Sequence, residues 1–233
     1  MKLFAKVILL VMVGLFCLWA VQAEAANIPG LYSTGVDNSN ALLLTGSVDP
    51  HYTLVAGADT RFTYPRSPVV VDLSTSPFNN WVANTPNSQW IGLQRDIGGY
   101  TDGLYKYDIT FDLTGLNPAT AVIAGQWAAD NGGTIFLNGA STGITDPIPL
   151  GFQSFHPFTI NSFTISRGFL PTLNTLEFQV DNVFADPGGF SASGLQVQLS
   201  GTANPVPEPL SLLFLGTGVV GMAMIGRRKQ IVK

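Results

Sequence analysis

Cysteine is almost absent from this chain of 233 residues, and its one cysteine, Cys17, lies inside an apolar N-terminal run. Phe16 precedes it where a lipoprotein cleavage site has a small residue, so we expect no lipid at Cys17. The remainder therefore has no disulfide, no thiol nucleophile and no cysteine-based zinc cluster. An ordinary apolar core must stabilise the fold.

Basic residues are also scarce. Residues 27–204 hold five basic and thirteen acidic side chains, a formal charge of −8, whereas the whole chain carries −4 because its ends are basic. A nucleic-acid partner needs a basic face to bind phosphates, so we exclude this class of partner. The acidic body is compatible with calcium binding and, more simply, with solubility outside a cell.

Groups for catalysis are few. The two histidines, His51 and His156, each neighbour a proline in a turn-like stretch, and no G-x-S-x-G motif occurs. Such histidines are typical of loops, although a serine triad is defined by geometry and not by spacing. Glycoside cleavage needs two facing carboxylates, and this body has one glutamate, Glu177. We therefore predict a protein without catalytic residues; the alternative is a secreted hydrolase acting on polysaccharide.

The N-terminus has the pattern of a secretory signal peptide. Lys2 and Lys6 make the start of the chain positively charged, and an apolar run follows over 7–21. Ala23-Glu24-Ala25 then offers a small-residue cleavage site. This order predicts a signal peptide over residues 1–25.

The C-terminus combines three features in a fixed order. Pro207-Glu208-Pro209 is followed by uncharged residues over 210–226 and then by Arg227-Arg228-Lys229. Seventeen residues span roughly 26 Å as a helix, near the lower limit for crossing a bilayer. The basic cluster would stay on the cytoplasmic side. The pattern predicts a transmembrane helix over about 210–226 with a basic tail.

This arrangement over residues 205–230 resembles the PEP-CTERM sorting signal of Gram-negative envelope proteins. The resemblance implies export across the inner membrane and processing by an exosortase-type membrane protease. It also implies a cell-envelope or extracellular location, with a transient or permanent anchor, and a link to exopolysaccharide in biofilm-forming bacteria. The alternative is a plain tail anchor that is never cut.

The body, residues 26–204, has the pattern of an all-β domain. Tyr105, Tyr107, Ile109 and Phe111 alternate with polar residues, which is the period of a half-buried strand. Further strands are expected near 52–55, 69–71, 121–129, 134–137, 158–165, 176–180 and 195–199, with short ones around the 84–87 loop. We predict an antiparallel β-sandwich or jelly roll. We also predict that 121–129 is covered on both faces, and that Asn131-Gly132 forms a hairpin.

Residues 127–139 and 173–182 resemble the galactose-binding-like jelly rolls. The similarity rests on an Asp-Asn-Gly turn, a strand that ends in Asn138-Gly139, and the later Leu-Asn-Thr-Leu strand. Pro171-Thr172 stands where these domains have a glycine. The resemblance covers about 104–200 and implies a fold more firmly than a ligand.

Two sets of candidate ligand-binding residues follow. Trp81 and Trp90 flank a polar loop, so we expect at least one to project and to stack on a sugar ring; the alternative is that they belong to the core, as we expect for Trp127. Asp130, Asn131, Asp181 and Asn182 offer oxygen ligands for calcium at strand ends. The alternative for these four is turn capping. The expected function is a non-catalytic surface or matrix module with carbohydrate as its candidate ligand.

Overall fold

The computed structural model describes residues 24–74, 80–96, 100–162, 168–183 and 190–206. Residues 25–204 form one compact unit, which contains the whole body. The apolar run of the predicted signal peptide lies outside the described residues. So do the predicted C-terminal sorting motif, its transmembrane helix and its basic tail. Within the described residues no helix is long and apolar enough to cross a membrane.

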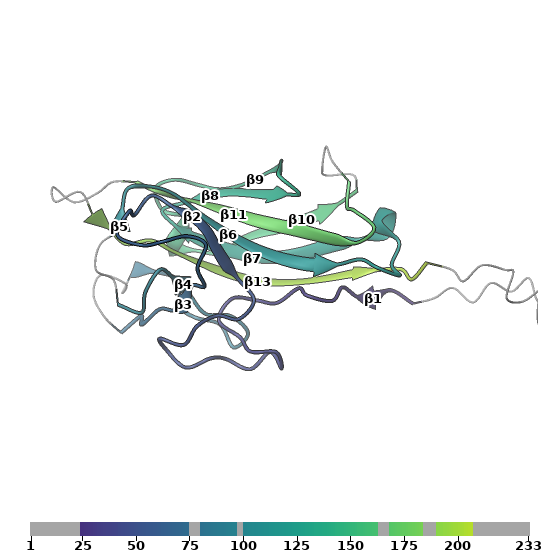
Figure 1. Ribbon diagram of the computed structural model, residues 1–233, viewed down its shortest axis with the longest axis horizontal. Helices are drawn as coiled ribbons and strands as arrows, with labels where there is room; N and C mark the ends of the chain where they lie inside the picture. Colours follow the sequence, from purple (N-terminus) through teal and green to yellow (C-terminus); the bar gives the residue numbers. More distant parts are fainter. Residues whose placement is uncertain (1–23, 75–79, 97–99, 163–167, 184–189, 207–233) are drawn as a thin grey trace, which may run out of the picture. The chain divides into compact units, whose positions relative to one another are not determined.

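The described part of the body is built from antiparallel strands without an α-helix (Figure 1). The first sheet contains, in spatial order, β10 (His156–Asn161), β7 (Val122–Asp130), β13 (Gly194–Ala203), β4 (Ile91–Gly92) and β3 (Val69–Val70), and β1 (Ala26–Asn27) also pairs with β13. The second sheet contains β2 (Thr53–Gly57), β6 (Gly103–Asp112), β11 (Leu173–Asn182), β8 (Gly133–Leu137) and β9 (Ala140–Asp146). A short ribbon joins β5 (Tyr100–Thr101) to β12 (Phe190–Ser191), and 3-10 turns occur at η2 (Pro118–Thr120) and η3 (Gly151–Gln153).

The strands with the clearest alternation form the centre of the second sheet. Tyr107 pairs with Phe178 and Ile109 with Leu176 between β6 and β11, and all four side chains are buried. The residues between them are polar and more exposed, because successive side chains of a strand point to opposite faces. The predicted strands near 105–113 and 176–180 are therefore confirmed.

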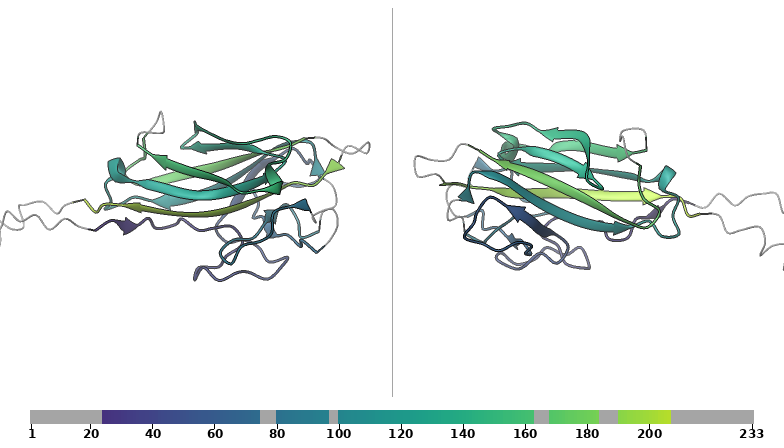
Figure 2. Two further views of the ribbon diagram at one scale, coloured as in Figure 1. Left: turned by 180° about the vertical axis from the view of Figure 1, so that it is seen from behind. Right: turned by 45° about the horizontal axis from the view of Figure 1, so that its top comes forward.

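The two sheets pack face to face around one apolar core, as a β-sandwich (Figure 2). Trp127 of β7 has no exposed surface, and its ring lies 5.5 Å from that of Phe178 in the opposite sheet. Phe158 of β10 reaches the same ring at 6.3 Å. The prediction that Trp127 belongs to the core is confirmed.

The predicted hairpin at Asn131-Gly132 is wrong. This dipeptide carries the chain from β7 in the first sheet to β8 in the second, and its backbone pairs with Asp181 of β11. Both sides of β7 are already occupied by β10 and β13, so β8 cannot pair with it. The tight turn lies instead at Asn138-Gly139, where both residues have positive φ, 51° and 77°, and connect β8 to β9.

β7 is central in its sheet, but it is covered on both faces only along its second half. Its last four residues, 127–130, are all buried, whereas Val122 and Ala124 are exposed. We call the side of the first sheet that faces away from the core its outer face; Ala124, Gln126 and Ala128 lie on it, since Trp127 points inward. Ala128 packs there in a second apolar cluster with Val71, Trp81 and Trp90. The part of the outer face beside Gln126 is left open.

Candidate functional site

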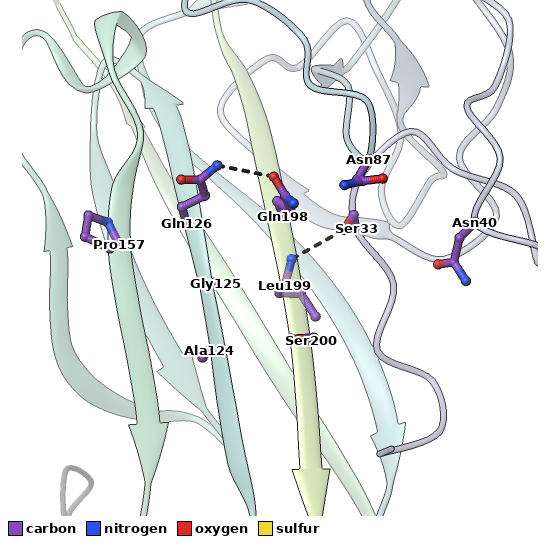
Figure 3. Close-up of a pocket in the computed structure, with 10 residues that line it drawn as sticks. All are labelled: Ser33, Asn40, Asn87, Ala124, Gly125, Gln126, Pro157, Gln198, Leu199 and Ser200. Carbon is purple, nitrogen blue, oxygen red and sulfur yellow. Dashed lines mark hydrogen bonds between the residues drawn. The ribbon is translucent and has the colours of Figure 1, made fainter. Parts of the chain in front are cut away.

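The open part of the outer face forms a groove of about 540 Å³ (Figure 3). This volume lies within the roughly 300–1,000 Å³ of ordinary small-molecule sites. Strands β7, β13 and β10 supply the floor, and residues of the 33–40 and 85–88 loops supply a wall. The groove is lined by Ser33, Asn40, Asn87, Ala124, Gly125, Gln126, Pro157, Gln198, Leu199 and Ser200.

A pair of glutamines lies at the centre of the floor. Gln126 and Gln198 are register partners on β7 and β13, and Gln126 Nε2 donates a hydrogen bond to Gln198 Oε1 at 3.2 Å. A glutamine amide has two N–H donors and a carbonyl oxygen with two lone pairs. The mutual bond uses only part of this capacity. The amides are thus oriented and retain donors and acceptors for a ligand.

Small residues keep the floor low beside these amides. Ala124 and Ser200 are register partners and both are exposed. At Gly125, a Cβ atom would lie 2.2 Å from the carbonyl oxygen of Gln198 and 2.9 Å from the Cα of Leu199. Any larger residue at 125 would push β7 away from β13, so this glycine keeps the two strands, and with them the two glutamines, together.

The first part of the wall is docked on the stretch of β13 that lies between its pairing with β4 at Leu195 and its pairing with β1 at Thr202 and Ala203. Ser33 Oγ accepts a hydrogen bond from the Leu199 amide at 3.3 Å. Thr34 Oγ1 accepts from the Val197 amide at 3.0 Å, and the Thr34 amide donates to the Val197 carbonyl at 2.9 Å. Hydroxyls and backbone of the 33–34 loop therefore satisfy strand groups that no neighbouring strand reaches.

The second part of the wall is held by buried amides. Gln196 has no exposed surface, and its Nε2 donates to both the carbonyl and the hydroxyl of Ser88 at 3.1 Å, beside the exposed Asn87. Gln89 Nε2 donates to the carbonyls of Gly35 and Leu43, at 2.8 Å and 2.9 Å. The loop that carries Asn40 is thus tied to the turn that carries Asn87, and the wall has a defined shape.

The candidate sugar-stacking tryptophans do not line the groove. Trp81 is 8% exposed and Trp90 is fully buried, with ring centroids 4.2 Å apart. Their indole N–H groups donate to Asp130 Oδ2 at 3.0 Å and to the Val82 carbonyl at 2.8 Å. The expectation that at least one of them projects is wrong, because together they cover Ala128 on the outer face. The alternative, a core role, describes them both.

The candidate calcium ligands are engaged in hydrogen bonds. Asn131 Oδ1 accepts from the Val183 amide at 2.9 Å, and Asn182, fully buried, bonds the Thr101 carbonyl and the Ser191 hydroxyl. Asp181 bonds the 131–132 segment through its backbone. Turn and loop capping therefore accounts for both asparagines. Among the described residues, no three His, Cys, Asp or Glu side chains are placed to hold a metal ion.

Two buried carboxyl groups lie near the end of β7. Asp130 is 4% exposed, and its Oδ1 has no hydrogen-bond partner. Asp146 is 2% exposed; its Oδ2 accepts from the Ala129 amide at 2.8 Å and its Oδ1 lies 3.2 Å from His156 Nε2. Burial raises the pKa of each carboxyl to about 7. No sequence pattern pointed to Asp146; Gly151 of η3 packs directly against its carboxyl group, where a Cβ atom would lie 2.5 Å from Oδ1.

Both histidines contact neighbouring side chains of the body. His51 lies in a turn, with its ring stacked on Tyr32 at 3.6 Å. His156 is the first residue of β10 and contacts Asp146 and the hydroxyl of Ser154 through the same nitrogen, Nε2. A serine triad needs the acid and the hydroxyl on opposite ring nitrogens, so this trio lacks the geometry.

The alternation of 195–199 with glutamines was visible in the sequence, but the groove was not. Its residues come from five separate stretches, and only the register of β7 against β13 brings Gln126 beside Gln198. Comparisons of the chain with protein-family models, with curated proteins and with solved structures find no match in any of the three.

Proposed function

We propose that this chain is an exported envelope or matrix protein whose body binds polysaccharide, without catalysis, in the groove on the outer face. The observation that carries the proposal is the lining: amides and hydroxyls in a groove whose wall is held by hydrogen bonds. Sugar hydroxyls both donate and accept hydrogen bonds, and glutamine, asparagine and serine side chains do the same. Gln126 and Gln198 supply the central contacts, and Asn40, Asn87 and Ser200 the flanking ones.

The address is proposed from the chain ends. A signal peptide over 1–25 starts export, and the motif Pro207-Glu208-Pro209 with its helix and the basic residues 227–229 directs the chain to an exosortase-type protease. The jelly-roll resemblance is compatible with a binding module, although it bears on the fold more than on a ligand. Together these features support a role beside exopolysaccharide at the cell surface.

Alanine substitution in the groove tests the binding. Each neutral hydrogen bond lost costs about 0.5–1.5 kcal/mol, so Gln126→Ala or Gln198→Ala should weaken polysaccharide affinity about 2- to 10-fold. The matched control is Gln153→Ala, an exposed glutamine outside the groove. Affinity electrophoresis or calorimetry with exopolysaccharide measures the effect. Equal affinities for all four proteins would refute the site.

The alternative, a secreted hydrolase, has one observation in its favour. Asp108 and Glu177 are register partners on β6 and β11, and burial together with the charge of Glu177 raises the pKa of Asp108 to about 6. A raised carboxyl pKa suits a general acid, but this pair belongs to the second sheet and does not line the groove. A hydrolysis screen on the same polysaccharides distinguishes the two functions. Cleavage products that form with the wild-type protein and are absent with Glu177→Gln would establish the hydrolase.

A further inference from the structure

We propose that the groove selects uncharged polysaccharides and discriminates against polyanionic ones such as uronic-acid polymers. This inference rests on the proposed polysaccharide binding. Its basis is that none of the ten lining residues carries a charge, while six present a hydroxyl or an amide: Ser33, Asn40, Asn87, Gln126, Gln198 and Ser200.

The basic side chains of the described body are engaged elsewhere. Arg61 is paired with Asp59, and Arg95 with Asp72. Lys106 lies 3.8 Å from Glu177 on the second sheet. The guanidinium of Arg66 lies over the Phe62 ring at 4.8 Å. None of these cations lines the groove.

Binding of a carboxylate normally needs a cationic side chain, and none lines this groove. Tight recognition of a sugar carboxylate normally uses Arg or Lys, because charge-assisted bonds are about twice as strong as neutral ones. A carboxylate that leaves water for a site with only neutral donors loses hydration without full compensation. A neutral sugar loses less hydration free energy, since its hydroxyls exchange hydrogen bonds to water for hydrogen bonds of similar strength to the amides.

The charge of the body acts in the same direction. Residues 27–204 carry a formal charge of −8. One of these charges lies beside the wall, at Asp37, whose backbone carbonyl accepts a hydrogen bond from the backbone N–H of Asn40. At low ionic strength this field repels a polyanion before contact. The repulsion is screened over about 8 Å at physiological salt, so the remaining discrimination there reports the groove itself.

The test uses the full-length protein in detergent and two kinds of probe. One is a panel of neutral glucans, mannans and galactans; the other is a uronic-acid polymer such as alginate of matched length. We expect binding within the neutral panel and at least 10-fold weaker binding of the polyuronate at physiological salt. Polyuronate binding as tight as the best neutral probe would overturn the inference and leave polysaccharide binding intact. No binding to any probe would overturn the proposed function, and the inference with it.

A charge placed in the groove sharpens the test. Gln198→Lys supplies the missing cation at the centre of the floor and should raise polyuronate affinity about 10-fold while it weakens neutral binding. Ser200→Lys is a second variant at an exposed position, in case the first disturbs the strand pair. The control is Gln153→Lys, which changes the net charge equally outside the groove. An equal gain for the control and both groove variants would contradict selection by the groove.

Discussion

The body should become less stable as the pH rises from 5 to 8, and Asp130 should be a main cause. Its carboxyl is 4% exposed, with Oδ2 bonded to the Trp81 indole and Oδ1 without a partner. Burial raises its pKa from 3.8 to about 7. A folded-state pKa above the unfolded value means that the stabilisation is complete below about pH 4 and is lost as the pH rises through about 7.

The magnitude follows from the size of the shift. One pKa unit corresponds to about 1.4 kcal/mol, so a shift of about three units amounts to roughly 4 kcal/mol once Asp130 is fully ionised. Asp146, 2% exposed and also raised to about 7, changes stability with the same sign. The two groups together make the free energy of unfolding fall by several kcal/mol between pH 5 and pH 8.

Urea denaturation of the body, residues 26–204, at pH 5, 6, 7 and 8 measures the slope. Asp130→Asn keeps an oxygen to accept the Trp81 bond and removes the charge, so the slope should drop by roughly a third to a half, because Asp146 and, below about pH 6, Asp108 still contribute. Asp112→Asn is the control, because hydrogen bonds from Thr114 lower the pKa of Asp112 and it should not alter the slope in this range. A wild-type stability that stays constant or rises from pH 5 to 8, or an unchanged slope in Asp130→Asn, would refute the reasoning.

Three further predictions concern the fold and the chain ends. The body alone should be soluble and give a strand-dominated circular dichroism spectrum, and more than about a quarter helix would contradict the sandwich. Trp90→Ala and Trp127→Ala, both at fully buried positions, should each cost about 3–5 kcal/mol in urea denaturation; near-wild-type stability of either variant would show that its ring is not core. Intact-mass measurement should show an envelope form that ends near Pro209, and alanines at 207–209 should trap the longer form; a wild-type protein that keeps Arg227-Arg228-Lys229 would instead indicate a plain tail anchor.

The alternation of apolar and polar residues was sufficient to predict the long strands. β6 and β11 alternate residue by residue because each has one face on the core, and this property is local to the strand. The assignment of strands to sheets is not local. Asn131-Gly132 has the composition of a hairpin, yet it crosses between sheets because β10 and β13 already occupy both sides of β7.

The tryptophans and the groove show the same limit. Trp81 and Trp90 stand beside a polar, proline-containing loop, and this neighbourhood suggested exposure. They are buried because the first sheet has an apolar patch at Ala128 on its outer face, which a loop must cover. The groove is the part of that face that this cover does not reach, so its position follows from tertiary packing that no single stretch encodes.

The measurement that tests polysaccharide binding most directly is a two-dimensional NMR titration of side-chain amides in the labelled body. Neutral oligosaccharides should shift the NH₂ signals of Gln126 and Gln198 first, with those of Asn40 and Asn87 following, while the signal of Gln153 stays in place. Shifts confined to residues outside the groove, or none at saturating oligosaccharide, would contradict the proposal that this groove binds polysaccharide.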